Sequence, residues 1–324
     1  MRVLQVLAPG QSAVVDLPTP QPARGEVLVR IDAVTTCPQW DLHLRHNEPM
    51  FIGHQFHYPY TLGQPGHEAS GVIEALGEGV EGLAVGDRVS LWRDRGHDLP
   101  GCYAQYVTCA ANDVIKVPAH LSPKATAPVE LAMCVGAAFL RLKEMNVIRG
   151  RQFAVMGLGP AGLIALQMAR AEGAARVVGF DFSAARRERA LQIGADAAFD
   201  PRDDLAERFP ARPAAPSIET GIDCVGAKAS VEWLMDHTSD VVALFGVQRE
   251  AYSFEPRHYN NLRLCGYTGH SRAAAEYAVS LLEAGTLDLL PLITHELPFS
   301  RYDEGIALLE RQEAIKICFL PWAE

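Results

Sequence analysis

The fold is decided by the stretch from Arg151 to Ala195, RQFAVMGLGPAGLIALQMARAEGAARVVGFDFSAARRERALQIGA. An apolar run, Phe153 to Met156, leads directly into Gly157-Leu158-Gly159-Pro160-Ala161-Gly162, and a helical pattern follows. This order predicts a buried parallel strand, a glycine turn and a helix.

Each glycine of this turn has a physical role in a dinucleotide site. Gly157 permits the tight turn, Gly159 lets the backbone approach a pyrophosphate, and Gly162 lets the helix pack closely on the strand. The helix N-terminus beside Pro160 offers free N–H groups and the positive end of the helix dipole. The alternative is a doubly wound sheet with an ordinary turn, since a glycine pattern alone is weak evidence.

An acidic residue at the end of the next strand strengthens the dinucleotide interpretation. Asp181 follows Gly157 at close to the spacing of about 20 residues expected for the carboxylate that bonds the ribose hydroxyls. A carboxylate there repels a 2′-phosphate, so the sequence favours NAD over NADP. Arg186 and Arg187 are the residues that would instead meet a phosphate. We also assign Cys224 and Gly246, at the ends of two further predicted strands, to the cofactor site.

Composition sets broad limits on structure and setting. With 324 residues, of which 48% are hydrophobic, the chain can bury a sizeable core and is long enough for two domains. The net charge of -10 argues against a nucleic-acid or anionic-membrane partner. The seven cysteines form no CxxC pair, which favours a reducing cytoplasm. We find no secretion signal, and the apolar region from Phe153 to Ala169 is interrupted by the glycine turn.

The chain predicts three consecutive segments. Residues 1–125 show short alternating strands punctuated by Gly and Pro, which is typical of a β-rich domain. Residues 126–270 alternate helical and apolar strand patterns, as a parallel sheet covered by helices requires. Residues 271–324 are too few to fold alone, so we expect them to complete the N-terminal β-rich domain.

A second constellation suggests a metal site in the β-rich domain. Cys37 follows a strand, and His67-Glu68 opens the next one. A thiolate and an imidazole are good zinc ligands, and a site with three protein ligands and one open position is the catalytic form. Glu130 or Cys134 would supply the third ligand. The alternative is that these side chains are simply packed.

The sequence resembles the zinc-containing medium-chain dehydrogenase/reductase family of alcohol, polyol and threonine dehydrogenases. The resemblance rests on GHEASGVIEALGEGV (66–80), GDRV (86–89), GCYAQYVTCAANDVIKVP (101–118), VMGLGPAGLIALQMARAEGA (155–174), VVGFDFSAARRERALQIGAD (177–196) and LDLLPLITHELPFSRYDEGIALLERQEAIKI (287–317). It implies a GroES-like catalytic domain and a Rossmann domain. It also implies that Cys37, His67 and Glu130 bind the metal, with Glu68 as an exchangeable ligand and Cys134 as the fallback for Glu130.

Three departures from the family pattern affect the site. The lobe that carries four cysteines and a structural zinc in many relatives is missing, so we expect one catalytic zinc and no structural zinc. Gln39 stands where relatives carry a Ser or Thr that relays the substrate proton, and one extra residue follows Cys37 before Asp41. With no hydroxyl at that position, His43 is the candidate proton acceptor.

The resulting prediction is an NAD-dependent zinc dehydrogenase acting on a secondary alcohol, a polyol, sugar or related hydroxy metabolite. Zinc stabilises the alkoxide while the carbinol carbon releases hydride to the nicotinamide. One alternative is a zinc-free reductase of the same superfamily that acts on an activated double bond or quinone. Another is a catalytically silent nucleotide-binding protein. We expect a small-molecule substrate and a homo-oligomer, a dimer or tetramer.

Overall fold

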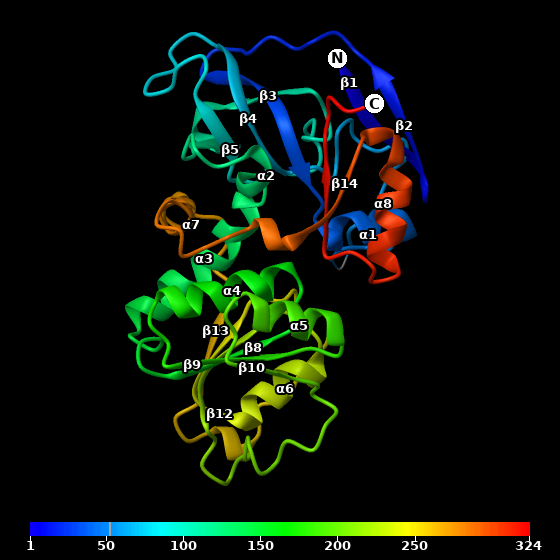
Figure 1. The fold of residues 1–324 in the computed structure, drawn as a ribbon. Coiled ribbons are helices and arrows are strands. Elements are labelled where there is room, and N and C mark those ends of the chain that lie inside the picture. Colours follow the sequence, from blue (N-terminus) through cyan, green and yellow to red (C-terminus); the bar gives the residue numbers. More distant parts are fainter. Residues whose placement is uncertain (52) are drawn as a thin grey trace. The chain divides into compact units, whose positions relative to one another are not determined.

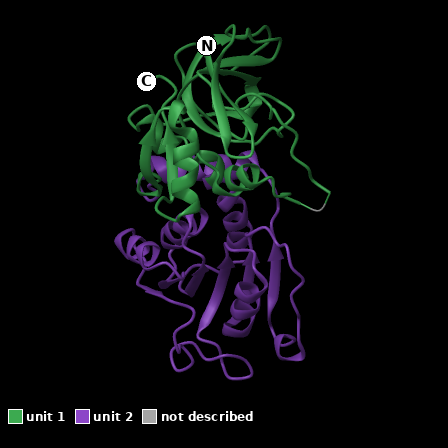
Figure 2. Cartoon of the chain, turned by 90° about the vertical axis from the view of Figure 1, so that its right-hand side faces the viewer, with its two compact units in different colours: residues 1–131, 289–324 green, residues 132–288 purple. Residues whose placement is uncertain are grey.

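The computed structural model describes residues 1–51 and 53–324. The chain divides into two compact units, one of residues 1–131 with 289–324 and one of residues 132–288 (Figure 2). The sequence predicts borders at residues 125 and 270. In the structure, residues 271–288 belong to the second unit, and residues 289–324 return to the first.

A six-stranded parallel sheet forms the centre of the second unit (Figure 1). Its strands lie in the order β10-β9-β8-β11-β12-β13, and each neighbouring pair is parallel. This is the strand order of a doubly wound dinucleotide-binding sheet, so the predicted fold class is confirmed. The strands are β8 (Gln152–Met156), β9 (Arg176–Phe180), β10 (Ala197–Phe199), β11 (Ile218–Asp223), β12 (Thr238–Leu244) and β13 (Arg263–Gly266).

Helices of the second unit connect these strands and pack against them. α4 and α5 pack on β8, β9 and β10, and α6 packs on β11 and β12. Ser183 caps α5 by accepting the Arg186 N–H, and Ser271 caps α7 in the same way. The helices are α3 (Val129–Glu144), α4 (Pro160–Ala171), α5 (Ala184–Gln192), α6 (Lys228–His237) and α7 (Arg272–Glu283), with a 3-10 turn at Pro256–His258.

The segment Pro123–Glu144 is long and apolar enough, by length and composition, to cross a membrane. Most of it, 83% of the apolar window, is buried inside the protein, as expected of a core helix. Its apolar character therefore reflects packing on several sides.

The first unit is built on a seven-stranded sheet and a two-stranded sheet. The larger sheet has the order β14-β15-β3-β4-β5-β7, and β6 also pairs with β3. Its strands are β3 (Glu26–Thr35), β4 (Glu68–Leu76), β5 (Arg88–Leu91), β6 (Tyr106–Ala110), β7 (Val114–Lys116), β14 (Ile293–Leu297) and β15 (Lys316–Phe319). The smaller sheet pairs β1 (Arg2–Ala8) with β2 (Gln11–Asp16).

Short helices complete the first unit, and both chain termini lie in it (Figure 1). They are α1 (Pro38–His46), α2 (Pro123–Thr126) and α8 (Tyr302–Glu310), with 3-10 turns at Ala111–Asp113, Leu290–Leu292 and Phe299–Arg301. Because β15 pairs antiparallel with β3, the C-terminal segment adds two strands to a sheet begun near the N-terminus.

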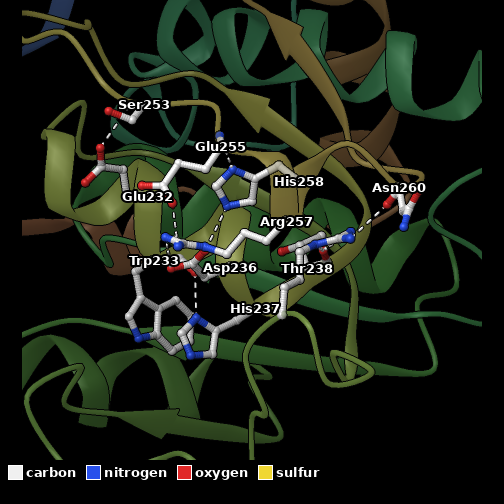
Figure 3. A network of polar contacts seen from close by, with 11 residues as sticks. Glu232, Trp233, Asp236, His237, Thr238, Ser253, Glu255, Arg257, His258 and Asn260 are labelled. Atoms are coloured by element: carbon white, nitrogen blue, oxygen red, sulfur yellow. Dashed lines mark hydrogen bonds and ion pairs between the residues drawn. The ribbon is translucent and has the colours of Figure 1, made fainter.

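A polar network fixes the loop between β12 and β13 (Figure 3). Asp236, near the end of α6, accepts hydrogen bonds from His258 Nε2 at 2.8 Å and Arg257 Nε at 2.6 Å. His258 Nδ1 accepts the Glu255 N–H at 2.9 Å, so the ring carries its proton on Nε2. The network lies where α6 meets the amino end of β12, whereas the glycine turn follows the carboxyl end of the parallel strand β8. The role of this polar network is structural.

Candidate active site

Strand register brings the predicted metal-binding residues together in the first unit. Thr35, the last residue of β3, pairs with Glu68 on β4 on one side and with Cys318 on β15 on the other. Cys37 follows β3 by two residues, and His67 precedes β4 by one. The ends of three strands therefore converge where these side chains lie.

Donor atoms of Cys37, His67 and Glu68 lie within 4.8 Å of one another. His67 Nδ1 bonds the Pro65 carbonyl oxygen at 2.9 Å, which orients the ring and directs Nε2 to the other side. Nε2 lies 3.9 Å from a carboxylate oxygen of Glu130, whose side chain is buried. An imidazole held through one nitrogen by a carbonyl is typical of zinc-binding histidines.

The charge around His67 favours a cation. Burial by itself lowers the pKa of an imidazole, yet Cys37 and Glu130 raise the pKa of His67 well above its ordinary value. The surrounding anionic groups thus stabilise positive charge at this position. A divalent metal ion supplies such charge, so the residues present fit zinc.

Glu68 is bound by a buried lysine. Lys316 Nζ donates to both carboxylate oxygens of Glu68, at 2.6 and 2.5 Å, and Thr35 Oγ1 donates to one of them at 3.0 Å. Burial raises the pKa of the Glu68 carboxyl group, and the positive charge of Lys316 opposes that rise. Coordination of a metal by Glu68 therefore competes with its ion pair to Lys316.

Both candidates for the third ligand lie on α3. Glu130 and Cys134 are separated by one helical turn, and both are buried.

In the described ranges of the chain, none of the seven cysteines forms a disulfide.

Helix α1 places the residues that follow Cys37. Cys37 is the N-cap of α1, and Asp41 lies one turn along it, with its N–H bonded to the Cys37 carbonyl at 3.0 Å. Asp41 points into the core, where it accepts hydrogen bonds from the hydroxyls of Tyr302 at 2.7 Å and Tyr103 at 3.0 Å. The structure therefore ties Asp41 to two core tyrosines.

His43 faces a shallow hollow of the first unit. Its Nδ1 bonds the Glu48 carbonyl oxygen at 3.0 Å. The hollow has a volume of about 320 Å³ and is also lined by Gln39 and His46. Within the described part of the chain, His43 makes no hydrogen bond or ion pair with Cys37, His67 or Glu68, so its role in proton transfer stays a prediction.

The glycine turn of the second unit has the geometry of a phosphate cradle. Gly157 has φ +86°, a conformation that other residues rarely adopt, and a Cβ on Gly162 would lie 1.8 Å from the Gly157 carbonyl oxygen. Gly159 differs, because its φ of -71° suits other residues and, among the described residues, a Cβ there would meet only Arg186, at 3.9 Å. Protein packing leaves space at Gly159, and a bound pyrophosphate would use that space.

Asp181 is fixed beside this turn. Its carboxylate accepts the N–H groups of Leu158 and Ser183, both at 2.8 Å, and retains lone pairs for further donors. Arg186 Nη1 lies 3.7 Å from that carboxylate. Arg187 Nη1 instead donates to the Asp181 carbonyl at 2.7 Å and also pairs with Asp200. Of the two arginines, Arg186 is thus the better placed to meet a ribose substituent.

Cys224 and Gly246 lie next to the carboxyl ends of the central strands. The Cys224 N–H bonds the Met156 carbonyl at 2.8 Å, and the Gly246 N–H bonds the Asp223 carbonyl at 2.8 Å. A Cβ on Gly246 would lie 2.3 Å from the Gly226 nitrogen, so close packing of two loops requires glycine there.

Comparison with known proteins gives two family matches. Residues 23–119 match the alcohol dehydrogenase GroES-like domain, and residues 160–284 match the zinc-binding dehydrogenase domain. The chain belongs to the zinc-type medium-chain dehydrogenase family. The predicted combination of a GroES-like and a Rossmann domain is confirmed.

Relatives in this family match nearly the full length of the chain. L-threonine 3-dehydrogenase of Pyrococcus horikoshii is 28% identical, and sorbitol dehydrogenase of Halalkalibacterium halodurans is 26% identical, each with 96% of both chains covered. The crystal structure of galactitol-1-phosphate dehydrogenase from Escherichia coli shares the fold with a TM-score of 0.85 at 22% identity, covering 99% of this chain and 100% of that one.

Three residues near the family's metal-binding positions escaped the sequence analysis. Lys316 lies in the return segment, and Asp94 and His97 lie in the segment that replaces the cysteine-rich lobe. Donor atoms of Asp94 and His97 lie within 4.8 Å of a donor atom of His67. Asp94-x-x-His97 offered a local signal, because both are metal-ligand types, but only the folded loop brings them to His67.

Proposed function

We propose that this chain is a zinc-dependent dehydrogenase that transfers a hydride between a secondary alcohol and NAD. The alcohol would be a polyol, sugar or related hydroxy metabolite, as the names of the relatives suggest. The observation that carries the proposal is the cluster of Cys37, His67 and Glu68 in a family of zinc-type dehydrogenases.

Cys37, His67 and Glu130 would hold the metal. The Pro65 carbonyl keeps the His67 ring in place. Lys316 binds Glu68, which would be an exchangeable ligand. When bound, zinc supplies a Lewis acid that polarises the alcohol oxygen and favours loss of its proton. We propose one zinc per chain, because closely spaced cysteines are missing between Ser90 and Pro100.

The second unit would bind NAD through the glycine turn and Asp181. Gly159 lets the backbone approach the pyrophosphate, and the N-terminus of α4 presents N–H groups to it. Asp181, oriented by two backbone bonds, would accept hydrogen bonds from the ribose hydroxyls and repel a 2′-phosphate. We further propose that the enzyme works in the cytoplasm as a homo-oligomer, with no nucleic-acid or membrane partner.

The test is NADH formation by the purified protein with a panel of polyols, sugars and secondary alcohols, together with elemental analysis. We expect turnover of at least one alcohol and a zinc content near one per chain. Removal of zinc by a chelator should abolish turnover, and added zinc should restore it. Metal-free reduction of a quinone or enone would support the alternative reductase. NAD binding without any turnover would support a silent nucleotide-binding protein.

A further inference from the structure

The loop between β5 and β6 carries a histidine to the proposed metal site. The His97 and His67 ring centroids are 6.2 Å apart, and donor atoms of His67, Asp94 and His97 lie within 4.8 Å of one another. All three residues belong to the first unit. The spacing is compatible with a shared cation.

His97 is held in place by two neighbours. Its Nδ1 lies 2.7 Å from the Tyr60 hydroxyl, and its ring packs on Trp40 with centroids 3.8 Å apart. Only 10% of the side chain is exposed. When Nδ1 carries the proton and donates it to Tyr60, the lone pair of Nε2 is available to a metal.

The Nε2 atom of His97 is buried and has no hydrogen-bond partner among the described residues. An unpaired buried nitrogen is costly, and native proteins rarely leave one without a purpose. Asp94 Oδ2 lies 3.7 Å from this nitrogen, beyond hydrogen-bond distance.

Asp94 adds negative charge beside this nitrogen. Its Oδ1 accepts the Gly96 N–H at 2.9 Å, and its side chain is 17% exposed. A carboxyl oxygen and two imidazole nitrogens so close together favour a cation between them.

We propose that His97 is an exchangeable zinc ligand through Nε2, with the Asp94 carboxylate beside it as a counter-charge. Zinc takes four ligands in a tetrahedral site, and Cys37, His67 and Glu130 would fill three positions. Because Lys316 holds Glu68, His97 would be the residue that supplies the fourth donor when no alcohol is bound. This inference rests on the metal site of the proposed function.

The test measures metal binding and needs no substrate. Metal-free wild-type protein and the variants His97→Ala, His97→Phe and Asp94→Asn are titrated with Co²⁺ in competition with a chromophoric chelator. His97→Phe keeps an aromatic ring against Trp40 and removes the nitrogen donor, so it guards against misfolding. His54→Ala is the matched control. The His54 ring also packs against Trp40, with ring centroids 5.6 Å apart, but His54 lies outside the cluster of His67, Asp94 and His97 donor atoms.

We expect both His97 variants to bind Co²⁺ roughly tenfold to a hundredfold more weakly and to change the visible absorption bands of the bound ion. Asp94→Asn should weaken binding less, and His54→Ala should match wild type. If His97→Phe binds Co²⁺ with wild-type affinity and shows an unchanged spectrum, this inference is wrong and the proposed function still stands. A wild-type protein that binds no Co²⁺ would contradict the proposed function itself.

Discussion

Lys316 and Glu68 form a fully buried ion pair between β15 and β4, with exposures of 0% and 1% for the two side chains. Lys316 also donates to the Thr36 carbonyl, so its charge is satisfied without water. A buried pair of this kind costs much desolvation energy, and breaking one half of it leaves an uncompensated charge.

Replacing Lys316 with Met should therefore destabilise the first unit by about 3 to 5 kcal/mol, because Glu68 loses its partner. The double variant Lys316→Met/Glu68→Gln removes the unpaired charge and should recover a large part of that loss. Denaturant unfolding of the metal-free proteins measures the loss of unfolding free energy in the single and the double variant. Equal losses in the single and double variants would show that the charge is not the cause.

The buried carboxyl group of Asp41 should make the stability of the protein depend on pH. Burial raises the pKa of this carboxyl group to about 6, although the hydrogen bonds from Tyr302 and Tyr103 oppose the rise. In the unfolded chain the pKa returns to its ordinary value of 3.8. Between these two values the folded state binds more protons than the unfolded state, so stability falls as pH rises.

From about pH 3 to about pH 7, wild type should lose about 3 kcal/mol of unfolding free energy relative to Asp41→Asn. The Asn carbonyl still accepts a tyrosine hydrogen bond but does not ionise. The measurement is the difference in unfolding free energy between the two proteins at each pH. A difference that does not change with pH would refute the buried titration.

Asp181 should select NAD over NADP. The Asp181→Ser variant removes the charge that repels a 2′-phosphate, so the ratio of kcat/KM for NAD to that for NADP should narrow or reverse. Adding Arg186→Ala should cancel any gain with NADP, because Arg186 is the nearer arginine to that carboxylate. Tighter binding of NADP than of NAD by the native protein would overturn the assignment.

The two candidates for the third metal ligand, Glu130 and Cys134, lead to opposite expectations for the metal content of their alanine variants. Glu130→Ala should cost most of the bound metal, whereas Cys134→Ala should cost only modest stability, as trimming a packed side chain does. Elemental analysis of the two purified variants decides between them. If Cys134→Ala releases the metal and Glu130→Ala keeps it, Cys134 is the ligand.

His43 should carry the alcohol proton if the path runs through the hollow beside Gln39. His43→Ala should then slow alcohol oxidation roughly a hundredfold or more, with zinc content and NAD affinity unchanged. His46→Ala is the matched control, because His46 lines the same hollow but pairs with Glu310 at 3.1 Å. An unaltered rate and pH profile in His43→Ala would place the proton path elsewhere.

Features that depend on neighbouring residues could be predicted from the sequence. The glycine turn, the apolar strands around it and Asp181 follow from contiguous patterns, and the structure has β8, α4 and β9 in that order. The sequence pattern does not predict β10, because its three residues are too few to show a period.

The contacts between polar groups far apart in the sequence depend on the packed fold. Lys316 reaches Glu68 across 248 positions because β15 pairs with β3 in one particular register. His97 reaches His67 through the path of a loop, and Asp41 meets Tyr302 from the first turn of α1. Strand register and loop path are properties of the whole packed unit, so no local spacing specifies these contacts.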